Sequence, residues 1–103
     1  MINRFYALGH VHSKKEGKTS NGKEFCEVVL KCQGFKADTW QYPMLTFWGE
    51  RAMQAALIAD GTMVYVEGYG DSRENDGRRY CQVNGGLIRE LGGRHKEEEE
   101  SAF

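Results

Sequence analysis

The chain alternates between hydrophobic and polar positions over much of its length, which is typical of β-strands with one face in a core. Residues 4–12 mix aromatic and aliphatic side chains and predict a first strand. Residues 25–32 predict a second strand, with Cys, Val, Leu and Cys at even positions on one face and Phe, Glu, Val and Lys at odd positions on the other. Between them lies a polar segment with the turn-forming pair Asn21-Gly22.

The spacing of hydrophobic residues changes from that of a strand to that of a helix in the middle of the chain. Residues 39–49 (TWQYPMLTFWG) predict a third strand, but residues 50–60 (ERAMQAALIAD) contain no glycine or proline and only Ile58 is β-branched. Met53, Ala56 and Leu57 recur at helical spacing, with Ala52 beside them. We therefore expect a short helix that buries this apolar stripe against the core.

Two further strands complete the pattern. Residues 62–70 (TMVYVEGYG) predict a fourth strand and residues 72–77 (SRENDG) a hairpin loop. Residues 78–83 predict the start of a fifth strand, which can continue through 84–91 after a glycine bend or bulge. Three strands, a helix and two strands is the order of the OB-fold, a five-stranded barrel that commonly binds oligonucleotides. The sequence therefore predicts an all-β fold of this kind, with one helix between strands three and four.

The third predicted strand has the most distinctive side chains. Alternation places Trp40, Tyr42 and Trp48 on one face, together with a methionine and a threonine, while the leucine and phenylalanine between them suit a barrel interior. Two structural explanations compete with a binding role for this face. In the first, the face forms a subunit interface. In the second, a bulge at Pro43 turns half of the strand inward and buries Trp48.

A nucleic-acid interface would explain both the rings and the cations near them. Aromatic rings stack on bases at about 1–3 kcal/mol each, while cations neutralise the phosphates. Candidate contacts lie on the loops expected beside the aromatic face: Lys31, Phe35 and Lys36 before the third strand, and Arg73, Arg78 and Arg79 in the later hairpin. Taken singly, each cation is an ordinary surface charge. Their grouping beside an aromatic strand favours single-stranded nucleic acid as the ligand.

Composition and motif spacing argue against several other classes of protein. The 103 residues suffice for one small domain, and they include neither an apolar run near the ~20 residues that span a bilayer nor the apolar segment of a signal peptide. Three cysteines without CxxC spacing predict neither a disulfide framework nor a zinc site. His10 and His12 lack a third metal ligand, and no nucleophile–base pair is evident. We expect a cytoplasmic protein with no enzymatic activity, no cofactor and no membrane association.

Charge is distributed unevenly along the chain. Residues 1–96 hold all 14 Lys and Arg but 11 of the 15 acids, which leaves +3, and Glu97, Glu98, Glu99 and Glu100 then contribute −4 before Phe103. Four adjacent like charges repel one another and hold water, so this segment cannot pack into a core. The simplest explanation is a solvated tail that aids solubility. The alternative is a tail that competes with polyanions for the basic body.

Several of these segments resemble one protein family. The helix entry FWGERAMQAALIADGTM, the strand VYVEGYG with RRY after its hairpin, the start MINRFYALGHV and the later NGGLIRELGGR are similar, in the same order, to the single-stranded DNA-binding proteins of bacteria and their phages. The resemblance spans residues 1–94. It implies an OB-fold that binds and protects single-stranded DNA with little sequence preference during replication, recombination or repair, and that assembles into dimers or tetramers.

The resemblance also implies roles for individual rings. The family's stacking aromatics correspond by position to Phe35 or its neighbour, to Tyr42 and to Trp48, with Trp40 as an extra ring on the same face. Asn75 stands where the family often has another aromatic in the hairpin, which Tyr69 or Tyr80 replaces only in part. The segment after Tyr80 is several residues shorter than is usual in the family.

The end of the chain, EEEESAF, resembles the acidic, phenylalanine-terminated tail with which the family recruits replication and repair proteins. Here Ala102 stands where proline is usual. The resemblance implies that residues 95–103 form a flexible tail that binds partners through Glu97–Glu100 and Phe103. The main alternative to DNA binding is an OB-fold adaptor of the primosome type, whose aromatic face mainly contacts protein. A small nuclease would need a carboxylate cluster that the sequence does not suggest.

Overall fold

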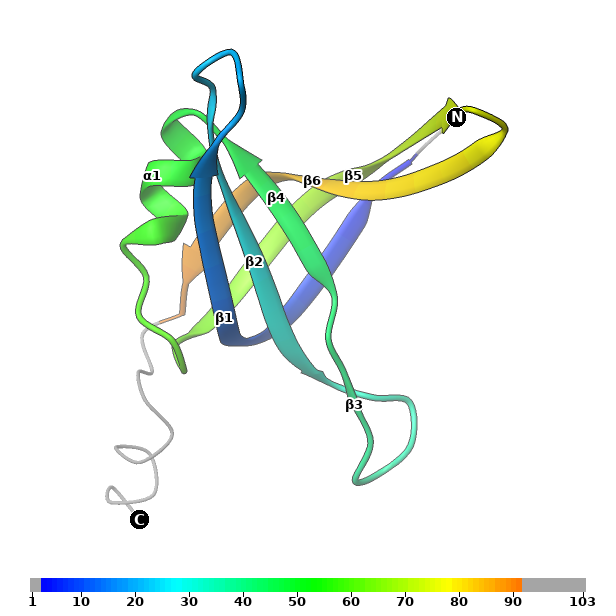
Figure 1. Ribbon diagram of the computed structural model, residues 1–103. Helices are drawn as coiled ribbons and strands as arrows, with labels where there is room; N and C mark the ends of the chain where they lie inside the picture. The colour runs from blue at the N-terminus through cyan, green and yellow to red at the C-terminus, as the bar shows by residue number, and fades with distance from the viewer. Residues whose placement is uncertain (1–2, 92–103) are drawn as a thin grey trace.

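The computed structural model describes residues 3–91, with only the backbone described at residues 73–75 and 79–81. Within this range the chain forms strands and one helix (Figure 1). These are β1 (Phe5–Lys18), β2 (Glu24–Gln33), β3 (Trp40–Gln41), β4 (Met44–Trp48), α1 (Glu50–Ala56), β5 (Met63–Asn75) and β6 (Arg78–Glu90). The lengths of β1, β5 and β6 allow each of these strands to contribute both to the barrel and to an extension beyond it.

Hydrogen-bonded strand pairs close the sheet on itself. β1 pairs with both β2 and β5, β5 pairs with β6, and β2 pairs with β4, all antiparallel. A parallel pairing between β4 and β6, at Thr46 and Asn84, completes the ring. With β3 and β4 taken as one interrupted strand, this is the five-stranded OB-fold barrel, with its helix after the third strand. The predicted fold is confirmed.

The third strand is interrupted at Pro43 but keeps its register. β3 and β4 both pair with β2 in one continuous antiparallel register, so the same face of the strand points outward on either side of the proline. Pro43 has no N–H to donate, but its carbonyl accepts a hydrogen bond of 2.9 Å from the backbone N–H of Leu30. The strand is therefore not turned inward at this point, although Thr46 on its outer face is itself buried.

The core fills the barrel and extends under α1. Its buried members are mostly β-branched or small residues, as expected for inward-facing strand positions. They are Val11, Cys26, Val28, Leu30, Leu45, Phe47, Ala52, Ala55, Ile58, Val64 and Val66. Desolvation on burial raises the pKa of the Cys26 and Cys32 thiols, so both remain protonated small apolar side chains at neutral pH.

α1 presents a different face to the core from the one predicted. Ala52 and Ala55 are buried, whereas Met53 is exposed and Leu57 is 87% exposed. The predicted apolar stripe is therefore wrong at Met53 and Leu57, whereas Ala52 is buried and Ala56 packs against the core as predicted. A helix of seven residues that lies close against a barrel has room for alanine but not for long side chains, so the small residues face inward.

The ends of α1 explain its short length. Gly49 precedes it with φ 62° and ψ −128°, a conformation open mainly to glycine. At the other end the Nζ of Lys14 on β1 donates to the carbonyl of Ala56 at 2.9 Å and also to that of Ile58. These bonds satisfy carbonyls that have no partner within the helix, so the helix ends at Ala56 rather than continuing to residue 60 as predicted.

β5 and β6 form a long hairpin that extends beyond the barrel (upper right of Figure 1). Strand pairing continues to Asn75 and Arg78, and the turn consists of Asp76 and Gly77 alone. Both turn residues have positive φ, 53° and 75°, as a type I′ turn requires. The predicted six-residue loop at 72–77 is therefore wrong in extent, because Asp-Gly closes the hairpin tightly.

The predicted glycine bulge in the fifth barrel strand is confirmed. The register shifts between Glu67 and Gly68 of β5 and leaves Gly86 of β6 as the extra residue. The adjacent Gly85 approaches the core so closely that a Cβ atom there would lie 2.2 Å from the ring of Phe47. The glycines thus let β6 bend across the barrel and close it.

Candidate functional site

The outer face of β2, β3 and β4 holds the aromatic residues singled out from the sequence. The antiparallel register sets Phe25 of β2 beside Trp48 of β4 on this face, whereas Leu45 is fully buried. Trp40 and Tyr42 are 49% and 50% exposed. Large aromatic side chains left half in solvent on one sheet face make this face a candidate interaction surface.

Four residues at the β3 end of this face form what we call the β3 cluster: His12, Lys31, Trp40 and Tyr42. The Nζ of Lys31 lies over the Trp40 ring, 4.5 Å from its centroid. His12 meets Tyr42 edge to face, with ring centroids 5.1 Å apart and an interplanar angle of 61°. His12 comes from β1, where the register shifts between Val11 and Ser13. Cationic and polar groups therefore flank both rings.

Four residues at the other end form the Trp48 cluster: Lys23, Phe25, Trp48 and Asn84. The Nζ of Lys23 lies 4.8 Å from the centroid of the Trp48 ring, and the Phe25 ring lies 5.8 Å from it, tilted by 58°. The indole Nε1 of Trp48 donates a hydrogen bond of 3.1 Å to Oδ1 of Asn84 on β6. Trp48 is half-buried, and contacts from the β1–β2 turn, from β2 and from β6 fix the position of its ring.

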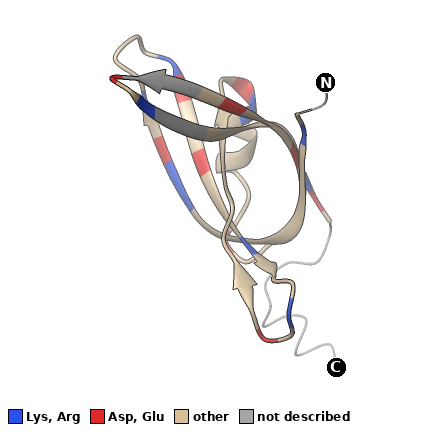
Figure 2. Ribbon diagram, turned by 90° about the vertical axis from the view of Figure 1, so that its right-hand side faces the viewer, with Lys and Arg blue, Asp and Glu red and all other residues tan. Residues whose placement is uncertain are grey.

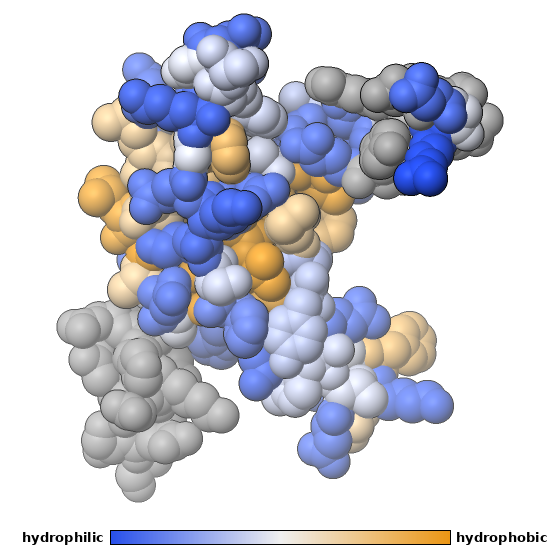
Figure 3. All heavy atoms as spheres, in the orientation of Figure 1, coloured by the Kyte–Doolittle hydropathy of each residue, from blue (hydrophilic) through white to orange (hydrophobic). Residues whose placement is uncertain are grey.

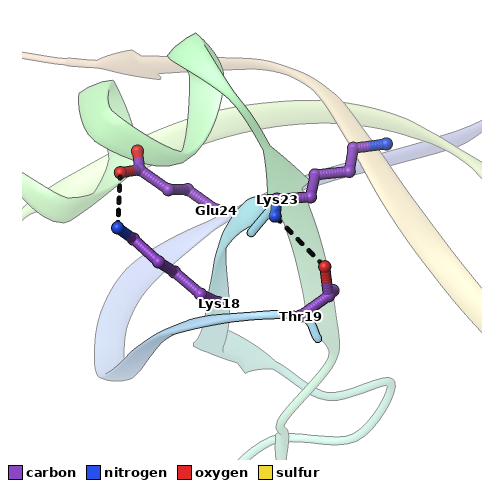
Figure 4. A network of polar contacts seen from close by, with 4 residues as sticks. All are labelled: Lys18, Thr19, Lys23 and Glu24. Carbon is purple, nitrogen blue, oxygen red and sulfur yellow. Dashed lines mark hydrogen bonds and ion pairs between the residues drawn. The ribbon is translucent and has the colours of Figure 1, made fainter. Parts of the chain in front are cut away.

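The turn between β1 and β2 positions Lys23. The backbone N–H of Lys23 donates to Oγ1 of Thr19 at 3.1 Å (Figure 4). The N–H groups of Thr19 and Gly22 donate to backbone carbonyls within the turn at 2.9 Å. Lys18 and Glu24 form an ion pair at 3.9 Å on the other side of the turn. The Lys23 side chain extends away from this pair, so its charge is available to the Trp48 cluster.

The loop between β2 and β3 carries two further predicted contacts. Phe35 is fully exposed, and Lys36 is exposed beside it. The loop is held by backbone bonds from Gly34 N–H to the Thr39 carbonyl (2.8 Å) and from Thr39 N–H to the Lys36 carbonyl (3.2 Å). A phenylalanine that touches solvent on all sides costs free energy unless a ligand covers it.

The β5–β6 hairpin brings Tyr69 and Arg78 to the other end of the site. Tyr69 is 52% exposed and lines a groove with Trp48, and Arg78 is exposed next to the hairpin turn. The backbones of Arg73, Arg79 and Tyr80 lie in this hairpin, but their side chains lie outside the part of the structure that is described. Glu97–Glu100 and Phe103 also lie outside the described residues.

The arrangement forms an open recess between two arms. In Figure 3 the hairpin and the β2–β3 loop stand out from the same side of the barrel, with a hollow between them. Charges of both signs are interspersed along the strands and on the β2–β3 loop (Figure 2). Half-buried Glu27 lies between the two clusters, opposite Thr46. The two described cations that lie over aromatic rings, Lys31 and Lys23, belong to the two clusters on either side of Glu27.

Sequence analysis missed several members of the two clusters. Alternation had placed Phe25 on the outer face, and Lys23 follows the predicted turn directly, so local signals for both were present. His12 and Asn84 had no such signal. They reach the site because β1 crosses to β2 through a bulge and β6 closes against β4, which are long-range features.

Among the side chains that the structure describes, no group of three or more His, Cys, Asp or Glu is placed to hold a metal ion. No helix within residues 3–91 is long and apolar enough to cross a membrane.

Comparison with known proteins shows likeness in structure but not in sequence. The chain matches no protein-family model and no curated protein sequence. It is similar to the mitochondrial single-stranded DNA-binding protein Rim1 of S. cerevisiae, with a TM-score of 0.69 and 15% identity over 85% of this chain and 94% of that one. It is also similar to the dimeric N-terminal domain of PriB from Thermoanaerobacter tencongensis, with a TM-score of 0.68 and 20% identity over 88% and 98% of the two chains. At these identities the likeness establishes the shared fold.

Proposed function

We propose that this protein binds single-stranded DNA with little sequence preference, as a protective coat during replication, recombination or repair. The observation that carries the proposal is the outer face of β2, β3 and β4. Trp40, Tyr42 and Trp48 all lie there, and Lys31 and Lys23 sit over the two indole rings. The structural likeness to a protein named as single-stranded DNA-binding supports it.

The chemistry of the face suits this ligand. Single strands expose both faces of each base, which stack on aromatic rings with little dependence on base identity. Lys23 and Lys31 also place positive charge within reach of the adjoining phosphates. The exposed Phe35 and Lys36 extend the same combination onto the β2–β3 loop. No step of this function requires a cofactor.

Intrinsic fluorescence tests the proposal directly, because Trp40 and Trp48 are the two tryptophans of the chain and both lie on the proposed face. Titration with oligo-dT should quench their emission in a saturable way. Duplex DNA of the same length and charge serves as the control and should quench far less, since its bases are already stacked. Equal responses to both, or no response to either, would contradict the proposal.

An OB-fold adaptor that uses the aromatic face for protein contacts is the second candidate, favoured by the likeness to the PriB domain. It predicts a different result in the same titration. The adaptor would show weak, salt-insensitive quenching by oligo-dT, whereas a DNA-coating protein would bind tightly at low salt and lose affinity as salt rises.

We also propose that the protein forms homo-oligomers through the outer face of β1 and β5. Tyr6 and Leu8 of β1 are more than half exposed, and Leu8 lies opposite Tyr65 in the sheet. A second copy is the natural occupant, because the PriB domain of the same fold is described as dimeric. Light scattering should give a multiple of 11.7 kDa, and Leu8→Glu should reduce it to one chain. A monomeric wild-type protein would rule this out.

We propose, finally, that the acidic tail recruits replication or repair proteins. The support is the charge pattern and the terminal phenylalanine of the sequence.

A further inference from the structure

A groove with its own polar lining adjoins the Trp48 cluster. On one face of the β5–β6 hairpin, Tyr69 lies opposite Asn84 and Asp71 lies opposite Gln82. These four residues line the groove together with Trp48, and the β1–β2 turn closes its other side. The antiparallel register places the four side chains as two adjacent cross-strand pairs, so the groove has a defined pattern of chemical groups.

The bottom of this groove is fixed in position. Asn84 is buried, and its Oδ1 accepts hydrogen bonds from Nε1 of Trp48 at 3.1 Å and from Nε2 of Gln82 at 3.3 Å. A hydrogen-bonded amide held in this way keeps the indole ring and the Gln82 side chain in one orientation. Preorganised groups of this kind select among ligands, because a ligand that fails to match them leaves them unpaired.

The groove combines aromatic walls with a carboxylate. Trp48 and Tyr69 both line it, and Asp71 contributes the carboxylate. Lys23 lines the groove as well, so a phosphate would lie beside Lys23 and the donor edge of a base beside Asp71. A carboxylate accepts at about four lone-pair positions, so Asp71 can bind a base in addition to another partner.

We propose that this groove is a base-selective subsite that prefers guanine within an otherwise sequence-tolerant DNA path. The proposal rests on the proposed function, because it assumes that a single strand follows the aromatic face. Guanine offers two parallel donors, N1–H and the 2-amino group, which match the two oxygens of one carboxylate. Thymine offers one donor between two carbonyl oxygens, and these oxygens would face the carboxylate unfavourably.

The expected preference follows from known discrimination by paired hydrogen bonds. A bidentate contact to a base changes affinity by roughly 5- to 150-fold, and a partly open groove belongs at the lower end of that range. We therefore expect a homothymidine oligonucleotide with one central dG to bind about fivefold or more tightly than the unsubstituted strand. The same position filled with inosine, which lacks only the 2-amino group, should bind like thymine. A central dA tests whether purine stacking alone accounts for the gain, and it should fall well below dG.

Fluorescence anisotropy of labelled strands measures these ratios. Asp71→Asn should abolish the dG preference while oligo-dT binding is kept or strengthened, since a negative charge is removed. Asp60→Asn removes the same charge from an exposed position on the loop between α1 and β5, and it should keep the wild-type ratio. Excess dGMP should not displace the strand.

Each of the following results would contradict a specific part of the proposal. Equal binding of dG, inosine and dT strands by the wild-type protein would overturn the subsite and leave the proposed function intact. A dG preference that survives in Asp71→Asn would overturn the role of the carboxylate. Displacement by dGMP but not by dTMP would assign the groove to a free nucleotide instead. Failure to bind any of the strands would overturn the proposed function itself.

Discussion

The two tryptophans show how residues on one face differ in what they do. Trp40 is half exposed and rests under Lys31, whereas Trp48 is half-buried, packs against Phe25 and hydrogen-bonds to Asn84. Trp40 can be exchanged without disturbing the barrel. Trp48 belongs both to the proposed binding face and to the junction between β4 and β6.

Trp40→Ala should weaken oligo-dT binding by about 1–3 kcal/mol and leave thermal stability nearly unchanged. Trp48→Ala should weaken binding by a similar amount and also destabilise the fold, by less than the 3–5 kcal/mol of a fully buried tryptophan but by roughly 1–2 kcal/mol. Leu57→Ala is a control for loss of exposed apolar surface, because Leu57 directly follows α1, outside the proposed face. Full DNA affinity in Trp40→Ala would remove this ring from the site.

Two neighbouring glycines give a matched test of barrel closure. Gly85→Ala places a Cβ atom 2.2 Å from the buried Phe47 ring, whereas the nearest neighbour of a Cβ at Gly86 is the Glu67 carbonyl oxygen at 3.7 Å. Overpacking of this kind costs about 1–3 kcal/mol, so urea denaturation should show that loss for Gly85→Ala and much less for Gly86→Ala. Similar values for both would mean that β6 does not bend against the core as described.

At the scale of elements, the β5–β6 hairpin is the arm that carries exposed charge toward the recess. Arg78 flanks its Asp-Gly turn, while Arg89 lies near the other end of the same strand. Binding to a single strand should weaken with salt at a log–log slope near −0.7 for each phosphate neutralised. Arg78→Ala should make this slope shallower by up to about one such unit, and Arg89→Ala should leave it unchanged. A shallower slope for Arg89→Ala but not for Arg78→Ala would place the bound DNA elsewhere on the barrel.

The elements differ in how far their sequence predicts them. Alternation correctly predicts the outer face of the third strand even across Pro43, because β3 and β4 keep one register against β2. The face of α1 was mispredicted because helical spacing alone does not tell which residues fit beneath a helix packed closely on a barrel, and there Ala55 is preferred to Met53. The extent of the hairpin was missed because Asp76-Gly77 forms a complete turn by itself.

The residues of the candidate site also differ in how far the sequence predicts them. Rings on one strand, such as Trp40 and Tyr42, could be assigned from alternation because their proximity is local in sequence. His12 and Asn84 could not, because each reaches the site through contacts between distant strands. Local patterns thus identify the surface, while the groups that orient its rings depend on closure of the barrel.

At the scale of the whole molecule, the charge of the chain is divided between a body of +3 and a tail of −4. The tail should therefore compete with DNA for the basic body at low salt. Removal of residues 97–103 should tighten oligo-dT binding at low salt, with the difference fading near 1 M, where the Debye length falls to about 3 Å. Unchanged affinity at low salt would show that the tail does not reach the site.

Phe103→Ala removes no charge and is the matched control for this deletion. It should leave DNA affinity nearly intact and abolish capture of replication or repair proteins from lysate, if the ring is their docking contact. An identical set of captured proteins with the intact chain and with Phe103→Ala would reduce the tail to an aid to solubility.

The pairing of Thr46 with Asn84 has a consequence for how the molecule opens. It joins β4 to β6 by one parallel residue pair, while β5 and β6 share a long antiparallel register. Such a short junction between distant parts of the chain should open before the rest of the sheet, in fluctuations far smaller than global unfolding. Asn84 also anchors Trp48, so a strand stacked on that indole would hold the junction shut. Amide hydrogen exchange at residues 46 and 84 should therefore slow on DNA binding more than exchange along β5, because the ligand would reinforce the weakest junction of the barrel.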